Sequence, residues 1–336
     1  MSLVVSDIEG IAMLCNPHSI SMRMGYIRNH MKKTFHLCLS SDDEVMFRDE
    51  EDYNRGFNCF ALALHKTDST GLVEAFMSTH VHLLVQTTDP NRFMGAFRMP
   101  YTKYFNRKYS RNGSLGEPVH FCMEIEGLYH HIAAMSYILR NGLHHGIVPI
   151  AYGYPHCSIN AIFQKDMGKV PVKDLIPQKS FYRYIGRNAD FPDRYKMSSS
   201  GVFLRESVLD IAQVENMFAT PRAFNYYMNR KTSEEWMREQ EKDTDQVHPV
   251  TLELIESKVH LTSVKDMLVF EGGRSDYKRK SDIELCVEID MLVRELFQKS
   301  SIYTLTDEEK HTIARIVRGK YFASTAQLSR CLAIRR

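Results

Sequence analysis

The sequence lacks paired cysteines and long apolar runs. Its seven cysteines are scattered through 336 residues, and none belongs to a CxxC pair, so we expect neither a disulfide framework nor a cysteine-rich zinc site. No apolar run approaches the length of a membrane span. No basic segment followed by a long apolar stretch opens the chain, as it would in a signal peptide. These absences predict a protein of the reducing cytoplasm with no membrane partner.

A large net charge is also absent. The chain has 43 Lys and Arg against 41 Asp and Glu, a formal net charge of +2, so nucleic-acid binding would have to come from local patches. The length suffices for two or three domains. Composition predicts a first domain of strands and helices over 1–160, a loop-rich and helical connecting region over 161–248, and a helical domain over 249–336.

Acidic residues are missing from residues 91–112, which therefore form a local basic patch. Asp89 and Pro90 predict that a helix starts just before it, and Pro100 should kink or split that helix. Aromatic residues recur every three to four positions and are expected to face the core, which leaves the basic face available for phosphates. The basic residues are Arg92, Arg98, Lys103, Arg107, Lys108 and Arg111.

The segment 77–85 reads MSTHVHLLV, and its alternation predicts a strand. On a strand His80 and His82 share one face above an apolar underside, so two imidazoles can bind one ion at the surface. The alternative is a pair of solvent-facing or hydrogen-bonded histidines without a ligand. Further strands are expected at 34–39 and 118–125, and helices at 49–64 and 128–145. Residues 71–78 and 80–87 are expected to form two strands or one long bent strand.

The helix expected at 128–145 carries Tyr137 and Asn141 one turn apart and off its main apolar stripe. The amide oxygen of Asn141 can be a third metal ligand beside two imidazoles, which leaves positions open for substrate, as in catalytic metal sites. A phenol with a pKa near 10 is a poor nucleophile until a cation or base favours its phenolate. The alternative for Tyr137 is an ordinary boundary tyrosine.

Taken together, these segments resemble the single-tyrosine HUH transposases, and within them the REP-associated tyrosine transposases. The resemblance covers about residues 30–160, less than half of the chain. The matching segments are the His-hydrophobic-His strand 77–85, the basic helix 98–111, the nucleophile helix 137–141 with 146–148, and the closing segment 154–158.

The resemblance implies an α+β fold, in which helices flank an antiparallel sheet in a ferredoxin-like HUH domain, followed here by a mainly helical C-terminal extension. It implies a divalent Mg²⁺ or Mn²⁺ ion held by His80, His82 and Asn141, and imidazole ligands suit Mn²⁺ better. It also implies that Tyr137 attacks single-stranded or hairpin DNA, forms a 5′-phosphotyrosine link, and transfers the strand. The family includes monomers and homodimers, so both states stay open.

Two departures from the family pattern favour alternatives. Gly142 follows Asn141 where the relatives usually have proline, and residues 113–118 read GSLGEP where a basic, aromatic stretch is common. One alternative is a non-catalytic DNA- or RNA-binding regulator that retains the fold. Another is a hydrolytic zinc enzyme, which is disfavoured because no acidic residue stands at an HExxH spacing from the histidines.

The C-terminal residues predict a helix, a short turn and a second helix. Capping boxes begin at Thr306 and at Ser324, with Gly319 between them. The arrangement resembles a helix-turn-helix that could contact duplex DNA, and the alternative is a plain packing domain. The polar and basic residues of the second helix are Gln327, Ser329, Arg330, Arg335 and Arg336.

Overall fold

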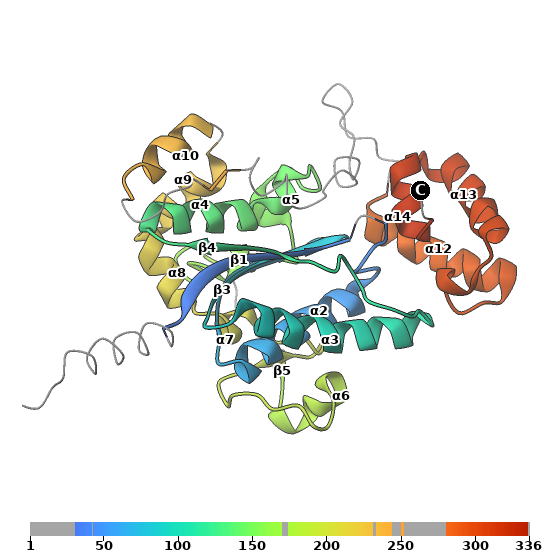
Figure 1. The fold of residues 1–336 in the computed structure, drawn as a ribbon, viewed down its shortest axis with the longest axis horizontal. Helices are drawn as coiled ribbons and strands as arrows, with labels where there is room; N and C mark the ends of the chain where they lie inside the picture. Colours follow the sequence, from blue (N-terminus) through green and yellow to red (C-terminus); the bar gives the residue numbers. More distant parts are fainter. Residues whose placement is uncertain are drawn as a thin grey trace, which may run out of the picture.

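The computed structural model describes residues 31–41, 43–169, 174–230, 233–243, 250–251 and 280–334. Within these residues the chain builds one four-stranded sheet with helices on both faces (Figure 1) and a second, two-stranded sheet. None of the described helices combines the length and the apolarity that a membrane crossing requires.

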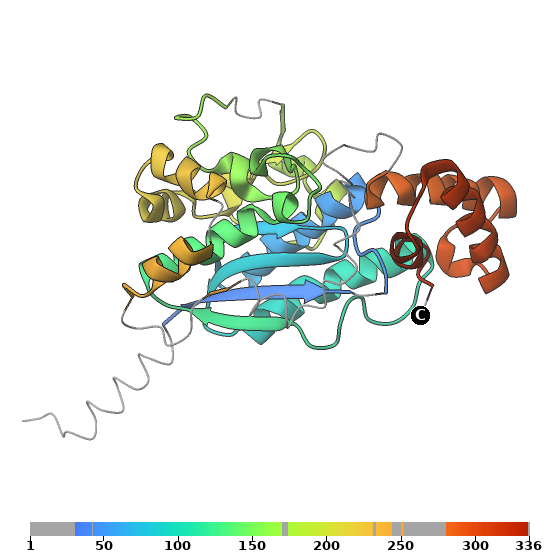
Figure 2. The same ribbon diagram turned by 90° about the horizontal axis from the view of Figure 1, so that it is seen from above.

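The larger sheet has the strand order β2-β3-β1-β4, and each neighbouring pair is antiparallel. The four strands lie side by side in Figure 2. All four were predicted, although β4 begins three residues later than expected. A three-residue turn joins β2 to β3, closed by a hydrogen bond from Met77 N to His80 O at 2.7 Å. The strands are β1 Lys33–Ser40, β2 Thr70–Phe76, β3 His80–Thr87 and β4 Phe121–Ile125.

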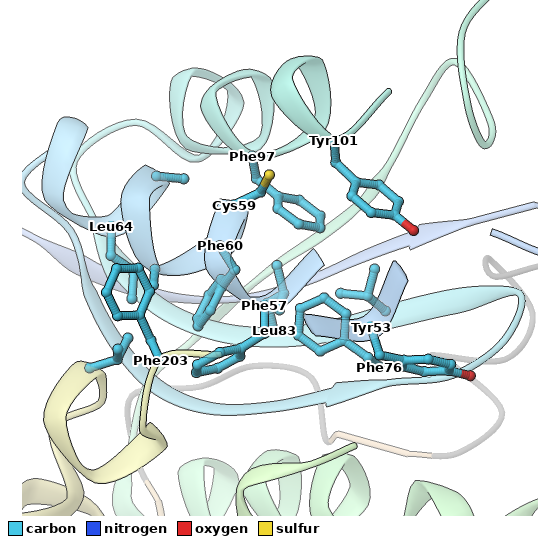
Figure 3. Close-up of a cluster of buried hydrophobic side chains, with 14 of the residues drawn as sticks. Tyr53, Phe57, Cys59, Phe60, Leu64, Phe76, Leu83, Phe97, Tyr101 and Phe203 are labelled. Atoms are coloured by element: carbon cyan, nitrogen blue, oxygen red, sulfur yellow. The ribbon is translucent and has the colours of Figure 1, made fainter. Parts of the chain in front are cut away.

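One face of the sheet packs on helices α2 (Glu50–Lys66) and α3 (Pro90–Tyr109). The apolar side of β3, which includes Leu83, contributes to this cluster, together with Phe57 of α2 and Phe97 of α3 (Figure 3). The alternation that predicted an apolar underside for β3 is therefore confirmed.

The other face of the sheet carries the alternate side chains of β3 and packs on helix α4 (Leu128–Leu139). Cys38 of β1 and Leu84 of β3 are buried here. Because both faces are covered, the polar side chains of β3 lie in the interior of the protein rather than at its surface.

Helices α2 and α3 start where the sequence predicted. The side chains of Asp49 and Asp89 accept hydrogen bonds from the backbone three residues on, as N-caps do. The predicted split at Pro100 does not occur, because α3 continues from Pro90 to Tyr109. Pro100 is exposed, whereas Phe97 and Tyr101 on either side of it are buried. This packing holds the helix together despite the missing N–H group.

The connecting region contributes to both faces of the sheet. Phe181 and Phe203 pack with α2, and Val214 and Phe224 pack with α4. The short helices η1 Ala151–Gly153 and η2 Ser158–Ala161 precede this region. Its own elements are β5 Leu175–Ile176, η3 Gln178–Ser180, α6 Tyr182–Ile185, β6 Met197–Ser198, α7 Arg205–Val208, α8 Ile211–Phe218, α9 Pro221–Asn229 and α10 Ser233–Gln240.

The C-terminal helices form a third cluster beyond the end of the sheet where β1 ends and β3 begins (Figures 1 and 2). Val45, from the connection between β1 and α2, belongs to its core. The guanidinium group of Arg48 donates to Asp290 at 2.7 Å and to Cys331 O at 2.8 Å. The elements are α12 Asp282–Phe297, η6 Ile302–Thr304, α13 Asp307–Tyr321 and α14 Thr325–Leu332.

The suggested DNA-reading role of α14 is wrong for two of its residues. Gln327 is 3% exposed and Arg330 is 1% exposed, and Arg330 donates to Asp282 at 2.7 and 2.8 Å. Neither side chain is available to a DNA base. Arg335 and Arg336 lie outside the described residues.

The two expected capping boxes differ in outcome. The box that starts at Thr306 is complete, with both reciprocal hydrogen bonds present. The box at Ser324 is only half formed, because the Gln327 side chain donates to Lys280 O and Asp282 instead of returning to the cap.

Candidate functional site

Strand β3 places His80 and His82 on the sheet face that α4 covers. Both side chains are fully buried, so the expectation that they lie at the surface is wrong. The His80 ring lies between two polar neighbours, with its Nδ1 3.2 Å from Thr79 Oγ1 and its Nε2 3.1 Å from Asn141 Oδ1. The His82 ring centre is 5.0 Å from that of His80.

Tyr137 and Asn141 approach these histidines from above the sheet. The predicted continuous helix is interrupted at Arg140, where α4 ends and the short helix α5 (Asn141–His144) begins. Helical hydrogen bonds from Arg140 N to Ser136 O and from His144 N to Arg140 O continue through the break. Tyr137 and Asn141 therefore stay one turn apart and both face the sheet.

The geometry brings together the four residues that the sequence singled out. Asn141 is fully buried and Tyr137 is 8% exposed. The ring centre of Tyr137 lies 5.2 Å from that of His82, at an interplanar angle of 86°. Tyr137 packs edge-to-face with His82, and Asn141 contacts His80. Both contacts come from a single helical turn.

Gly142 packs closely against Tyr154. A Cβ atom at this position would lie 2.6 to 2.9 Å from three atoms of Tyr154, so a larger residue would force the surrounding structure to shift. The Tyr154 hydroxyl donates to Phe76 O at 2.6 Å, and Phe76 N donates to His156 O at 2.8 Å. The segment after α5 thus ties the edge of strand β2 to the helix that carries Asn141.

Three further histidines belong to this cluster, and the sequence did not identify them as site residues. His36 of β1 places its Nε2 3.1 Å from His82 Nδ1. The ring centre of His145 lies 5.3 Å from that of His80, and the exposed His144 has its ring centre 6.1 Å from that of Tyr137.

The sequence contained part of the information needed to identify His36 as a site residue. The strand predicted at 34–39 already placed His36 and Cys38 on one face. In the structure Cys38 pairs with His82 and His36 pairs with Leu84, so His36 is the diagonal neighbour of His82. That register cannot be read from one sequence.

Burial keeps the central imidazoles neutral. Desolvation lowers the pKa of His36 to about 3 and, against a raising contribution from the Asn141 contact, the pKa of His80 to about 4. The pKa of His82 is lowered well below its usual range, first by desolvation and then by the neighbouring histidines. A neutral imidazole has one nitrogen lone pair for a cation, so all three rings are in the form that a metal ligand requires.

One pair of potential ligand atoms has the spacing that a divalent ion would need. Adjacent ligands of an octahedral ion with bonds of ~2.1 Å lie ~3.0 Å apart, and His80 Nε2 and Asn141 Oδ1 are separated by 3.1 Å. The buried atoms His82 Nε2 and Asn141 Nδ2 have no hydrogen-bond partner among the described residues. Across the same residues no three His, Cys, Asp or Glu side chains form a metal-binding group. The oxygen of Asn141 would therefore have to be part of the ligand set.

The six basic residues of the predicted phosphate-binding face divide into two groups. Arg92, Lys103 and Arg107 are exposed. Arg98 donates to three backbone carbonyls between Leu115 and Pro118. Helix α3 lies on the face of the sheet opposite to the histidines (Figure 1).

The remaining two basic residues are held by carboxylates. Lys108 lies within 3.0 Å of Asp49, Glu51 and Asp52, and Arg111 pairs with Glu44. Like Arg98, they stabilise the fold internally, which leaves three side chains of α3 for phosphates.

Comparison with known proteins adds little to this geometry. No protein-family model and no curated protein matches the sequence. A solved structure described as a REP-associated tyrosine transposase bound to a REP hairpin matches 49% of this chain and 90% of its own, with 13% sequence identity and a TM-score of 0.35. A likeness of that size establishes neither fold nor function for this chain. The function has to be inferred from the residues and contacts themselves.

Proposed function

We propose that this protein cleaves and rejoins single-stranded DNA through Tyr137, with a divalent ion held by His80, His82 and Asn141. The observation that carries the proposal is the convergence of these four side chains from β3 and from one helical turn. His80 Nε2 meets Asn141 Oδ1 at 3.1 Å, and Tyr137 packs against His82 with ring centres 5.2 Å apart.

The strand order also supports a ferredoxin-like arrangement. Helix α2 connects β1 to β2, α3 connects β3 to β4, and the antiparallel order is β2-β3-β1-β4. This order places β1 and β3 in the centre of the sheet. The two strands that carry His36, His80 and His82 are therefore the best supported ones, which suits a site that needs fixed ligand positions.

In the proposed reaction the Tyr137 hydroxyl oxygen forms a bond to phosphorus and the bond between phosphorus and the 3′ oxygen breaks. The phenol loses its proton and the departing 3′ oxygen gains one. Rejoining is the reverse attack by a 3′-hydroxyl group, so no external energy source is needed. A bound divalent ion would withdraw charge from phosphorus and stabilise the departing oxygen.

The chain's own residues have three roles in this proposal. The contact with His82 fixes the ring of Tyr137. The buried Nδ2 group of Asn141, which has no partner among the described residues, can donate to a phosphate oxygen. Because Tyr137 is 8% exposed and His144 beside it is exposed, the phosphate is expected to approach past His144. Burial of the rest excludes water and favours rejoining over hydrolysis.

The test is capture of the covalent link. Hairpin-bearing single-stranded DNA and Mn²⁺ should yield a protein–DNA adduct that survives denaturing electrophoresis, and Tyr137→Phe should abolish it. Tyr129→Phe, which changes a half-buried tyrosine on the same helix, should leave adduct formation unchanged. If Tyr137→Phe forms as much adduct as the wild type, Tyr137 is not the nucleophile.

A second candidate is a DNA-binding regulator without chemistry. The complete burial of His80, His82 and Asn141 favours it, because buried polar groups are also found as hydrogen-bonded networks that only specify a core. A regulator would bind DNA in a salt-sensitive manner that is indifferent to Mn²⁺ and to His80→Ala. Metal-dependent binding that His80→Ala abolishes would exclude it.

A further inference from the structure

We infer that His36 is a positioning residue: its Nε2 accepts the Nδ1 proton of His82 and thereby leaves the Nε2 lone pair of His82 free for an ion. This inference deepens the proposed site and rests on the proposed function for the presence of the ion. In this role His36 would act through His82 and would not itself bind the ion.

The contact itself is specified by the sheet. His36 Nε2 and His82 Nδ1 are 3.1 Å apart and both side chains are fully buried. Their strands are adjacent, and the pairing of His36 with Leu84 and of Cys38 with His82 makes them diagonal neighbours on one sheet face, within reach of each other. The ring of Phe121 on the neighbouring strand β4 meets His36 edge-on, with ring centres 5.4 Å apart, and holds it in place.

The protons on the two rings show how this contact is linked to the tautomer of His82. Each neutral imidazole has one N–H group and one lone pair. Two arrangements satisfy the contact: either His82 Nδ1 donates to His36 Nε2, or His36 Nε2 donates to His82 Nδ1. In the second arrangement the proton of His82 is on Nε2, and that nitrogen cannot bind a cation.

The two arrangements are balanced unless something binds His82. Both His36 Nδ1 and His82 Nε2 are buried and have no hydrogen-bond partner in the described part of the chain, so each arrangement leaves one N–H and one lone pair without a partner. An ion on His82 Nε2 selects the first arrangement. His36 then accepts the Nδ1 proton of His82, as carboxylates and carbonyls do for the histidine ligands of other metal sites.

His36 also explains why a carboxylate is unnecessary there. The ring centre of His82 lies 5.2 Å from that of His36 and 5.0 Å from that of His80. A neutral acceptor orients the ring without adding a buried charge, which an isolated core position disfavours. His36 therefore lets His82 adopt the tautomer that an ion selects without a buried carboxylate beside it.

The first test is spectroscopic and uses the full chain without DNA. In protein labelled with ¹⁵N-histidine and loaded with Mg²⁺, long-range ¹H–¹⁵N spectra should show the proton on His82 Nδ1, with a coupling across the hydrogen bond to His36 Nε2. His82→Gln assigns the signals. A proton on His36 Nε2 in the loaded protein would overturn the inference, and so would the absence of any Mg²⁺-dependent change at His82.

The second test is Mn²⁺ affinity measured by calorimetry, again without DNA. His36→Leu should weaken binding by about 10- to 100-fold, the range found for partners of metal-bound histidines. His36→Gln, whose amide oxygen can accept the same proton, should recover most of the loss. His311→Gln, at an exposed histidine of α13, is the matched control and should bind as the wild type does.

The outcomes separate this inference from the proposed function. If His36→Leu is folded and binds Mn²⁺ within about threefold of the wild type, a margin well inside the expected loss, the positioning role is refuted even where DNA adducts form. If the tautomer and the affinities are as expected but no adduct forms, strand cleavage fails and the role of His36 stands. The spectroscopic test does not use His36→Leu, so a folding defect in that variant cannot hide the answer.

Discussion

Removal of the Asp282 carboxylate should destabilise the whole protein, because this group joins the C-terminal helices to the start of strand β3. Asp282 accepts two hydrogen bonds from Arg330, at 2.7 and 2.8 Å, and both residues are almost fully buried. It also accepts from Gln327 at 3.1 Å and from Ser78 at 2.9 Å. Ser78 lies in the turn directly before His80.

The size of the effect follows from what Asp282→Ala leaves behind. The guanidinium group of Arg330 would remain buried without its partner, and breaking a buried ion pair in this way costs about 3–5 kcal/mol. Ser78 and Gln327 lose an acceptor as well, so the upper half of that range is expected. For a chain of this size such a loss lowers Tm by about 10 °C.

The assay is thermal unfolding followed by circular dichroism, with Glu295→Ala as the control. Glu295 is an exposed carboxylate on the same helix, and its removal should change stability by no more than about 0.5 kcal/mol. The loss of stability in Asp282→Asn should lie between those of Asp282→Ala and Glu295→Ala, since an amide keeps an acceptor but not the charge. If Asp282→Ala costs less than about 1 kcal/mol, close to the value of a single exposed pair, the C-terminal helices are not held to the sheet as described.

Two further predictions concern Asn141's neighbour and the basic helix. Gly142→Ala should cost about 1–3 kcal/mol, because the added methyl group overlaps Tyr154; an unchanged unfolding midpoint in urea would show that the helix and Tyr154 are not packed closely. Arg107→Ala, at an exposed residue, should reduce the salt dependence of DNA binding by about one unit of slope without changing Tm. Arg98→Ala should lower Tm without changing the salt dependence of DNA binding, because Arg98 donates to three carbonyls of the 115–118 loop. If both variants changed Tm and salt dependence equally, the distinction between exposed and internally bonded basic residues would be wrong.

Local signals predicted the elements of the fold well. The alternation along residues 77–85 correctly placed Leu83 and His82 on opposite faces of a strand, because side-chain direction on a strand depends only on position. The Asp89–Pro90 signal marked the start of α3 to within one residue, because an N-cap acts on the backbone directly after it.

Burial could not be predicted in the same way. The sequence led to the expectation that His80 and His82 lie at a surface, because a polar face of a strand usually meets water. Whether it does depends on what packs above it, and here α4 covers it. The same limit applies to α14: the basic residue Arg330 looked available to DNA, and its partner Asp282 is 48 positions away along the chain.

Packing explains some of the polar atoms at the candidate site but not all of them. A buried polar core needs each group to be paired, and His80 with Asn141 and His82 with His36 meet that need on one side of each ring. The remaining nitrogen atoms His36 Nδ1, His82 Nε2 and Asn141 Nδ2 are buried, and they have no partner among the described residues. An apolar side chain would fill the place of His82 at lower cost than a half-paired imidazole. Under the proposed function an ion bound by His82 Nε2 would complete the pairing of this residue, and Tyr137, whose ring packs on that of His82, would lie beside that ion.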